Sequence, residues 1–218
     1  MSPAETVLEE IRAELAHIRD QLLTHPYLAA VEGGLVDLTQ LRAFAGEQHA
    51  IITSDLRSVA CLVSRFGDEL FLDVLSGERA SLAALFPFAA ALGMGRQDLE
   101  DYEPLPGAHA YTAYIAWMAS HASAAEVATA YVINFGTWGE SCGRLSRALR
   151  GRYHLPREAL RLLDQFATPA DDFEERACAI VTAGLERGVP RRLLHRSARL
   201  LQSYELLYWD TLLGELQR

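Results

Sequence analysis

Lysine is absent from this sequence of 218 residues, and all twenty basic residues are arginine. Without a lysine amine, the chain has no group for Schiff-base catalysis or for covalent attachment of pyridoxal phosphate. It also has no phosphate-binding loop of the Walker type, because that loop needs its lysine. Several classes of enzyme are therefore excluded before any motif is considered.

Cysteine is also scarce. The three cysteines, Cys61, Cys142 and Cys178, lie far apart in the chain. An odd number at such wide spacing fits neither a disulfide framework nor a zinc knuckle, so each is predicted to be a small buried residue. Cys142 follows Glu140 and Ser141, but nothing near it in the sequence marks a reactive thiolate.

Long apolar runs and excess positive charge are missing as well. No apolar run reaches the roughly 18 residues of a membrane span, so we expect no membrane partner. The first six residues lack the basic and then apolar pattern of a signal peptide, and we expect a cytoplasmic protein. The formal net charge of −9 opposes binding to nucleic acid.

Half of the residues are apolar, and they recur mainly with helical spacing. No segment shows the alternation of a strand. We therefore predict one all-α domain over residues 1–218, a multi-helix bundle of seven to nine helices. A capping box is expected at Ser123 and Glu126. The helices are predicted at residues 3–24, 26–32, 38–66, 69–92, 108–120, 123–150, 156–166, 169–187 and from 191 to the end.

Metal and haem sites find little support in the residue spacing. Helical bundles that bind two irons commonly carry Glu-x-x-His motifs, and none occurs here. Glu47 and His49 are two residues apart and point in different directions on a helix. His25 could be an axial haem ligand, but beside Pro26 it is more typical of a hydrogen-bonding helix cap. We predict no metal and no cofactor.

The most informative segment is residues 204–210 of the last helix. Glu205 lies four residues after Leu201 and three before Tyr208, so it is predicted on or beside the buried face. A buried carboxylate is unfavourable unless it is paired or hydrogen-bonded. Glu205 is therefore either a functional group or a side chain bonded to solvent or a neighbouring helix.

Aromatic and polar residues on several predicted helices could together form an apolar slot with a few polar groups. Such slots hold flat heteroaromatic ligands by stacking and one or two directed hydrogen bonds. The alternative is that most of these aromatic residues are simply core. The set comprises Phe44, Tyr111, Tyr114, Tyr131, Phe135, Trp138, Tyr208 and Trp209, with Glu47, Gln48, Asn134, Glu140 and Glu205.

Short motifs spread over nearly the whole chain resemble the TenA family, which has a haem-oxygenase-like helical fold. The resemblance includes the His25-Pro26-Tyr27 segment, a Gly-Leu step at Gly34, the Gln-containing segment of residues 41–49, Ala110-Tyr-Thr-Ala-Tyr, and Tyr204-Glu205-x-x-Tyr208-Trp209. It implies a haem-oxygenase-like fold and a homodimer or homotetramer.

The best-known activity of that family is thiaminase II, an aminopyrimidine aminohydrolase of thiamin salvage. The resemblance implies that Glu205 matches the family's last-helix glutamate and Tyr111 a pocket tyrosine. The family's aspartate falls at Glu47, Gln48 or His49. The nucleophilic cysteine of its Pro-Cys segment falls near Asn134, where this chain has no cysteine.

The sequence therefore predicts a TenA-like protein that binds a small, flat, nitrogen-containing ligand, with altered chemistry relative to thiaminase. Two alternatives stay open: a metal-dependent, di-iron-type oxidase of the same fold, and a non-catalytic regulatory or oligomeric protein. Glu205 is the predicted catalytic residue. The predicted ligand-binding residues are Phe44, Glu47, Gln48, Tyr111, Asn134, Trp138 and Tyr208.

Overall fold

The computed structural model describes residues 2–168 and 172–217, and these residues contain helices but no strand. The all-α prediction is confirmed. The helices are α1 (Pro3–Glu14), α2 (Ala16–Leu23), α3 (Pro26–Gly33), α4 (Leu41–Phe66), α5 (Glu69–Ala91), α6 (Arg96–Glu100), α7 (Pro106–His121), α8 (Ala124–Gly151), α9 (Arg161–Phe166), α10 (Phe173–Glu186) and α11 (Arg191–Leu216).

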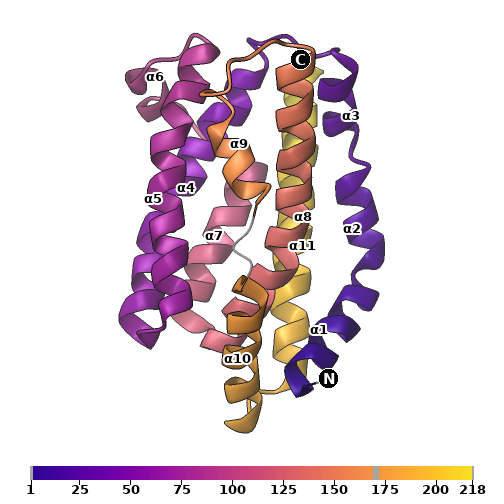
Figure 1. Cartoon of the computed structure of the whole chain (residues 1–218), viewed down its shortest axis with the longest axis vertical. Helices are drawn as coiled ribbons and strands as arrows, with labels where there is room; N and C mark the ends of the chain where they lie inside the picture. The colour runs from indigo at the N-terminus through magenta and orange to yellow at the C-terminus, as the bar shows by residue number, and fades with distance from the viewer. Residues whose placement is uncertain (1, 169–171, 218) are drawn as a thin grey trace.

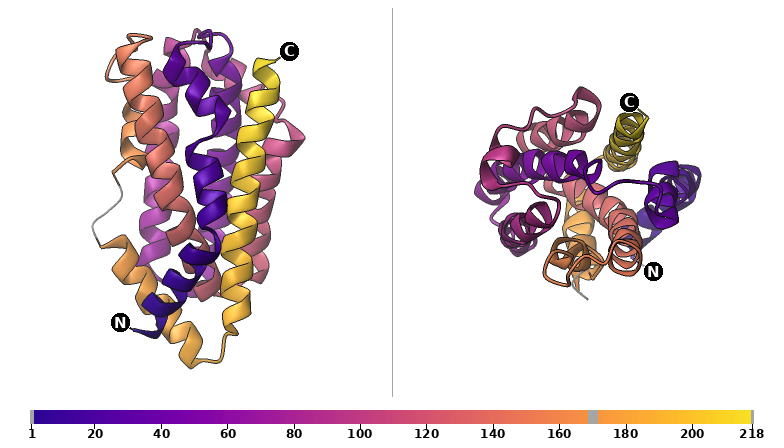
Figure 2. Two further views of the ribbon diagram at one scale, coloured as in Figure 1. Left: turned by 90° about the vertical axis from the view of Figure 1, so that its right-hand side faces the viewer. Right: turned by 90° about the horizontal axis from the view of Figure 1, so that it is seen from above.

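The long helices run roughly along one axis and form a bundle (Figure 1). Helix α4 packs against α5 and α7, and α11 packs against α7 and α8. The two ends of the chain lie at opposite ends of the bundle (Figure 2). No helix in the described part of the chain is long and apolar enough to cross a membrane.

The first predicted helix, residues 3–24, is wrong in one respect because it is divided at Leu15. The Leu15 backbone leaves the helical region, while its N–H still bonds to the Ile11 carbonyl oxygen at 2.9 Å. The bend lets α1 pack against α10 while α2 packs against α11 and α8. Tertiary packing, with Leu15 itself buried, therefore overrides a continuous helical pattern.

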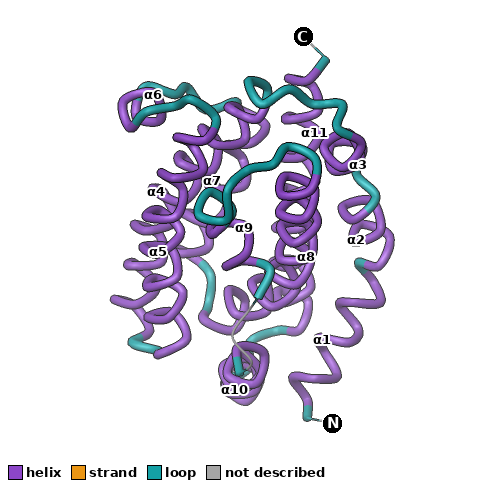
Figure 3. Tube along the Cα trace, turned by 45° about the horizontal axis from the view of Figure 1, so that its top comes forward, coloured by secondary structure: helices purple, strands orange, loops and turns teal. Residues whose placement is uncertain are grey.

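The helix boundaries after α8 also differ from those predicted. Residues 157–160 form successive turns, so only Arg161–Phe166 of the predicted helix 156–166 is α-helical. This connection is visible at one end of the bundle (Figure 3). The expected start at Pro169 lies outside the described residues, and α10 begins at Phe173. With these divisions the described residues hold eleven helical segments, more than the predicted seven to nine.

Other helix ends follow the sequence closely. Ser123 and Glu126 form the predicted capping box. Asp68 caps α5 by accepting a hydrogen bond from the Leu70 N–H. Just before it, Gly67 ends α4 with φ of 62°, a left-handed conformation that glycine adopts without strain.

Gly139 allows α9 to approach α8. A Cβ atom at this position would lie 2.6 Å from the Phe166 carbonyl oxygen, which is a backbone atom of α9. Only a residue without a side chain fits there, and Phe166 itself lies on the edge of Trp138, with ring centroids 6.0 Å apart.

We expect Gly139→Ala to destabilise the protein by about 1–3 kcal/mol, because overpacking forces the α9 backbone to move. Gly136→Ala on the same helix is the matched control, since a Cβ there meets nothing within 4 Å. That control should be neutral or stabilising by up to about 1 kcal/mol, from helix propensity. Thermal unfolding of both variants tests this, and equal shifts would contradict the close approach.

Candidate functional site

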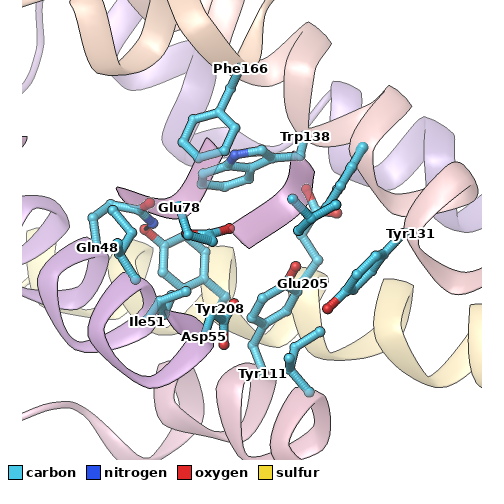
Figure 4. A pocket seen from close by; sticks show the side chains of 14 residues that line it. Gln48, Ile51, Asp55, Glu78, Tyr111, Tyr131, Trp138, Phe166, Glu205 and Tyr208 are labelled. Atoms are coloured by element: carbon cyan, nitrogen blue, oxygen red, sulfur yellow. Dashed lines mark hydrogen bonds between the residues drawn. The ribbon is translucent and has the colours of Figure 1, made fainter. Parts of the chain in front are cut away.

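A cavity lies between α4, α5, α7, α8, α9 and α11, with about 570 Å³ of space not filled by atoms, part of which is open to solvent. Its wall is mainly aromatic and aliphatic, with carboxylates from three helices and one amide (Figure 4). The lining residues are Gln48, Ile51, Ile52, Asp55, Val74, Glu78, Tyr111, Ile115, Tyr131, Phe135, Trp138, Phe166, Glu205 and Tyr208.

Glu205 lines this cavity and is almost fully buried. Asn134 Nδ2 donates a hydrogen bond to its Oε2 at 2.7 Å, and Trp209 Nε1 donates to its Oε1 at 3.3 Å. Burial raises the pKa of Glu205 to about 8, although both hydrogen bonds act in the opposite direction. A carboxyl group in this state can accept or donate a proton near neutral pH.

Asn134 connects two walls of the site. Its Oδ1 accepts a hydrogen bond from the Tyr111 hydroxyl at 2.8 Å, while its Nδ2 bonds to Glu205. Tyr111 and Glu205 line the cavity, but Asn134 lies behind them and is 1% exposed. The asparagine therefore orients the carboxylate from α8 without facing the cavity itself.

Gln48 and Tyr208 form a second polar pair at the wall. Gln48 Nε2 donates to the Tyr208 hydroxyl oxygen at 2.9 Å. Trp138 presents its ring edge-on to Tyr208 and to Phe166, with centroids 5.9 and 6.0 Å away. These residues from four helices, α4, α8, α9 and α11, surround a space suited to a flat ring.

Phe44 and Glu47 were predicted in the same ligand set, but neither is among the cavity-lining residues. Phe44 packs between Phe88 and Trp209. Glu47 accepts hydrogen bonds from the Tyr102 hydroxyl and, at 2.7 Å, from the Leu105 N–H. Because Glu47 precedes Gln48 by one residue, its side chain points about 100° away around the helix.

Sequence reasoning missed Asp55, Glu78 and Phe166 as cavity residues. Asp55 lies seven residues after Gln48 on α4, a spacing that returns to the same helix face and that would have indicated it. Glu78 is on α5, where nothing in the local pattern distinguishes it from solvent-facing acids. Phe166 reaches the cavity only because Gly139 lets α9 approach, which no local pattern reveals.

Cys142 is fully buried and is not among the residues that line the cavity. Burial raises the pKa of its thiol well above the usual value, so the reactive thiolate is disfavoured.

His25 caps α3 by accepting a hydrogen bond from the Tyr27 N–H, and its Nε2 lies 3.1 Å from Asp210 Oδ1. The interpretation of His25 as a helix cap is thus confirmed.

A metal centre has no evident set of ligands in the described part of the chain. No group of three or more histidine, cysteine, aspartate or glutamate side chains there has an arrangement that could hold a metal ion. The lining residues include three carboxylates but no histidine. This donor set does not fit the di-iron oxidase alternative.

Comparison with solved structures establishes the class of fold. A TenA homologue from Pseudomonas syringae has a TM-score of 0.79 at 14% identity, covering 94% of this chain and 92% of that one. A TenA homologue from P. horikoshii has a TM-score of 0.76 at 15% identity, covering 96% and 99%. A domain of unknown function with a heme oxygenase-like fold, from Shewanella denitrificans, has a TM-score of 0.75 at 14% identity, covering 96% and 92%.

These similarities define a heme oxygenase-like fold, as predicted. The model of the TENA/THI-4/PQQC family matches residues 12–215, and the chain belongs to this family. No curated protein sequence matches the chain.

The raised pKa of Glu205 predicts a pH dependence of stability. The folded state holds the Glu205 proton up to about pH 8, whereas the unfolded state releases it near 4.5. Because the folded state then binds more protons, the free energy of unfolding falls as the pH rises through this range and levels off above it. At about 1.4 kcal/mol for each pKa unit, the contribution is on the order of several kcal/mol.

Urea unfolding between pH 5 and 9 measures this effect. Glu205→Gln should flatten the decline relative to the unmodified protein, since the amide does not titrate. Glu158→Gln, at an exposed position between α8 and α9, should leave the slope unchanged. An identical decline in the Glu205→Gln variant would contradict the assignment.

Proposed function

We propose that this TenA-family protein binds a small, flat, nitrogen-containing ligand in the cavity between α4, α5, α7, α8, α9 and α11. The observation that carries the proposal is Glu205, a carboxylate held in an aromatic-lined cavity by two neutral donors. Neighbouring N–H groups of a heteroaromatic ring or its amino substituent match such an acceptor.

The aromatic walls supply most of the affinity in this proposal. Trp138, Phe166 and Tyr208 offer ring surfaces and edges, so a planar ligand gains contact without large side-chain rearrangement. Gln48, tethered to Tyr208, is a second polar group at the wall. Hydrogen bonds between the ligand and the Gln48 amide, and from ligand N–H groups to Glu205, then fix the orientation of the ring.

If the bound ligand is turned over, the reaction that fits best is hydrolysis of an amino substituent. Water adds to the ring carbon as its proton passes to Glu205, and the carbon–nitrogen bond breaks as that proton passes to the departing amine. Since Cys142 does not line the cavity, direct attack by water replaces a covalent step. Asn134 positions the carboxylate throughout.

A thermal-shift screen with 4-aminopyrimidines, thiamin fragments and purines tests the binding proposal. At pH 9, where Glu205 is ionised, at least one class should stabilise the protein. Glu205→Gln should then weaken that ligand at least tenfold, because a hydrogen bond to a charged group contributes about 1.5–3 kcal/mol. Glu140→Gln, an exposed position on α8, is the control. Undiminished binding by Glu205→Gln would remove the role given to this carboxylate.

Removing Asn134 should change the proton affinity of Glu205 and not only the local packing. Asn134→Ala deletes a hydrogen bond that lowers the Glu205 pKa, so the pH profile of ligand binding should move to higher pH. Tyr111→Phe keeps the bond between Asn134 and Glu205 and should leave the midpoint in place. Isothermal titration from pH 6 to 9 measures both profiles, and superimposable profiles would oppose the positioning role.

A further inference from the structure

We infer that the part of the cavity formed by α4 and α5 binds an organic cation, the protonated amine or amidinium group of the ligand, through Asp55 and Glu78. This inference deepens the proposed function, since it assigns a charged substituent to the flat ligand. It concerns different residues from Glu205, which lies on α11.

Asp55 and Glu78 come from adjacent packed helices and line the same cavity (Figure 4). Asp55 is 7% exposed, and its Oδ1 accepts a hydrogen bond from the Thr112 hydroxyl at 2.9 Å. Glu78 is half-buried, and it interacts electrostatically with Asp55 but forms no hydrogen bond or ion pair with any described residue. One oxygen of Asp55 therefore has a hydrogen-bond partner, whereas the Glu78 carboxylate is open to the cavity.

No positive group among the described residues forms an ion pair with either carboxylate. The chain has twenty basic residues, and none of those that the structure describes lines the cavity. Burial raises the pKa of Asp55 to about 7, and burial together with the charge of Asp55 raises that of Glu78. Two like charges in one buried site are unfavourable without a counter-charge, and a bound cation supplies it.

Tyr131 gives an independent indication of a ligand here. Its side chain is 2% exposed and lines the cavity, but its hydroxyl has no hydrogen-bond partner among the described residues. Burial raises the pKa of Tyr131 well above its usual value, and the charges of Asp55 and Glu78 add to this shift, so the hydroxyl lies within their electrostatic reach. A buried hydroxyl normally finds a partner, and a ligand N–H group is one.

The surroundings favour an organic cation over a metal ion. The ring of Tyr131 stacks on Phe135 with centroids 4.9 Å apart, and Tyr111 adds a third aromatic wall. Aromatic faces attract ammonium and amidinium groups through cation–π interactions. This attraction adds to that of the two carboxylates. The described residues offer no group of three ligands suited to a metal.

The test compares two probes of nearly equal size, benzylamine and benzyl alcohol, by isothermal titration at pH 8. The unmodified protein should bind the cationic probe at least tenfold more tightly than the neutral one. Glu78→Gln and Asp55→Asn should each reduce this ratio toward one. Glu69→Gln, an exposed acid on α5 that changes the net charge equally, should preserve it.

Glu205→Gln separates this inference from the proposed function. It should weaken 4-aminopyrimidine while keeping the preference for benzylamine, because Glu205 is on another wall. If aminopyrimidine binding is lost but the preference for benzylamine remains, the role of Glu205 is supported and the cation site is unaffected. If no aminopyrimidine binds the unmodified protein while benzylamine is still preferred, the proposed function fails but the cation site stands. Equal binding of the two probes, binding of neither, or an unchanged ratio in Glu78→Gln would overturn the inference. Glu78 has no partner to lose, so that variant should remain folded.

Discussion

Glu205 is a carboxyl group buried in the middle of a helical bundle, with no ion-pair partner among the residues that the structure describes. Of these residues, two neutral donors bond to its oxygens: Asn134 from α8 and Trp209, one turn further along α11. This arrangement constrains both helices, because a shift of α8 relative to α11 would leave the carboxylate without a partner in an apolar environment. Tyr111 extends the same constraint to α7 through Asn134. The relative position of three central helices is therefore tied to one side chain.

The sequence was sufficient for the class of fold because its signals are local. Capping residues such as Ser123 and Asp68 and the absence of alternating strands required no knowledge of the tertiary structure. The bend at Leu15 and the turns before α9 were missed for the opposite reason. Each depends on which neighbouring helix the segment packs against, and helical periodicity continues through both. Local pattern thus identifies where most helices lie, but not how they bend to pack on their neighbours.

The sequence likewise predicted only some of the residues of the candidate site. Glu205, Gln48, Tyr111, Trp138 and Tyr208 were predicted from residue type and spacing, and the structure brings them to one cavity. Three predicted ligand-binding residues lie elsewhere. Phe44 packs in the core and Glu47 bonds to the α6–α7 connection, because both point to other faces of α4 than Gln48 does. Asn134 lies behind the wall, where it bonds to Tyr111 and Glu205. Asp55 and Glu78 were missed because acids at helical positions usually face solvent. Only the packing of α4 on α5 reveals that they face the interior.

The placement of the acids bears on how the proposed ligand would be oriented in the cavity. An apolar cavity with one carboxylate has a single anchor, and a flat ligand can rotate about it. The cavity here has acceptors on separate walls, Glu205 from α11 and the Asp55–Glu78 pair from α4 and α5. A ligand that donates hydrogen bonds at both ends is then held in one orientation, which is a condition for attack by water at a defined atom.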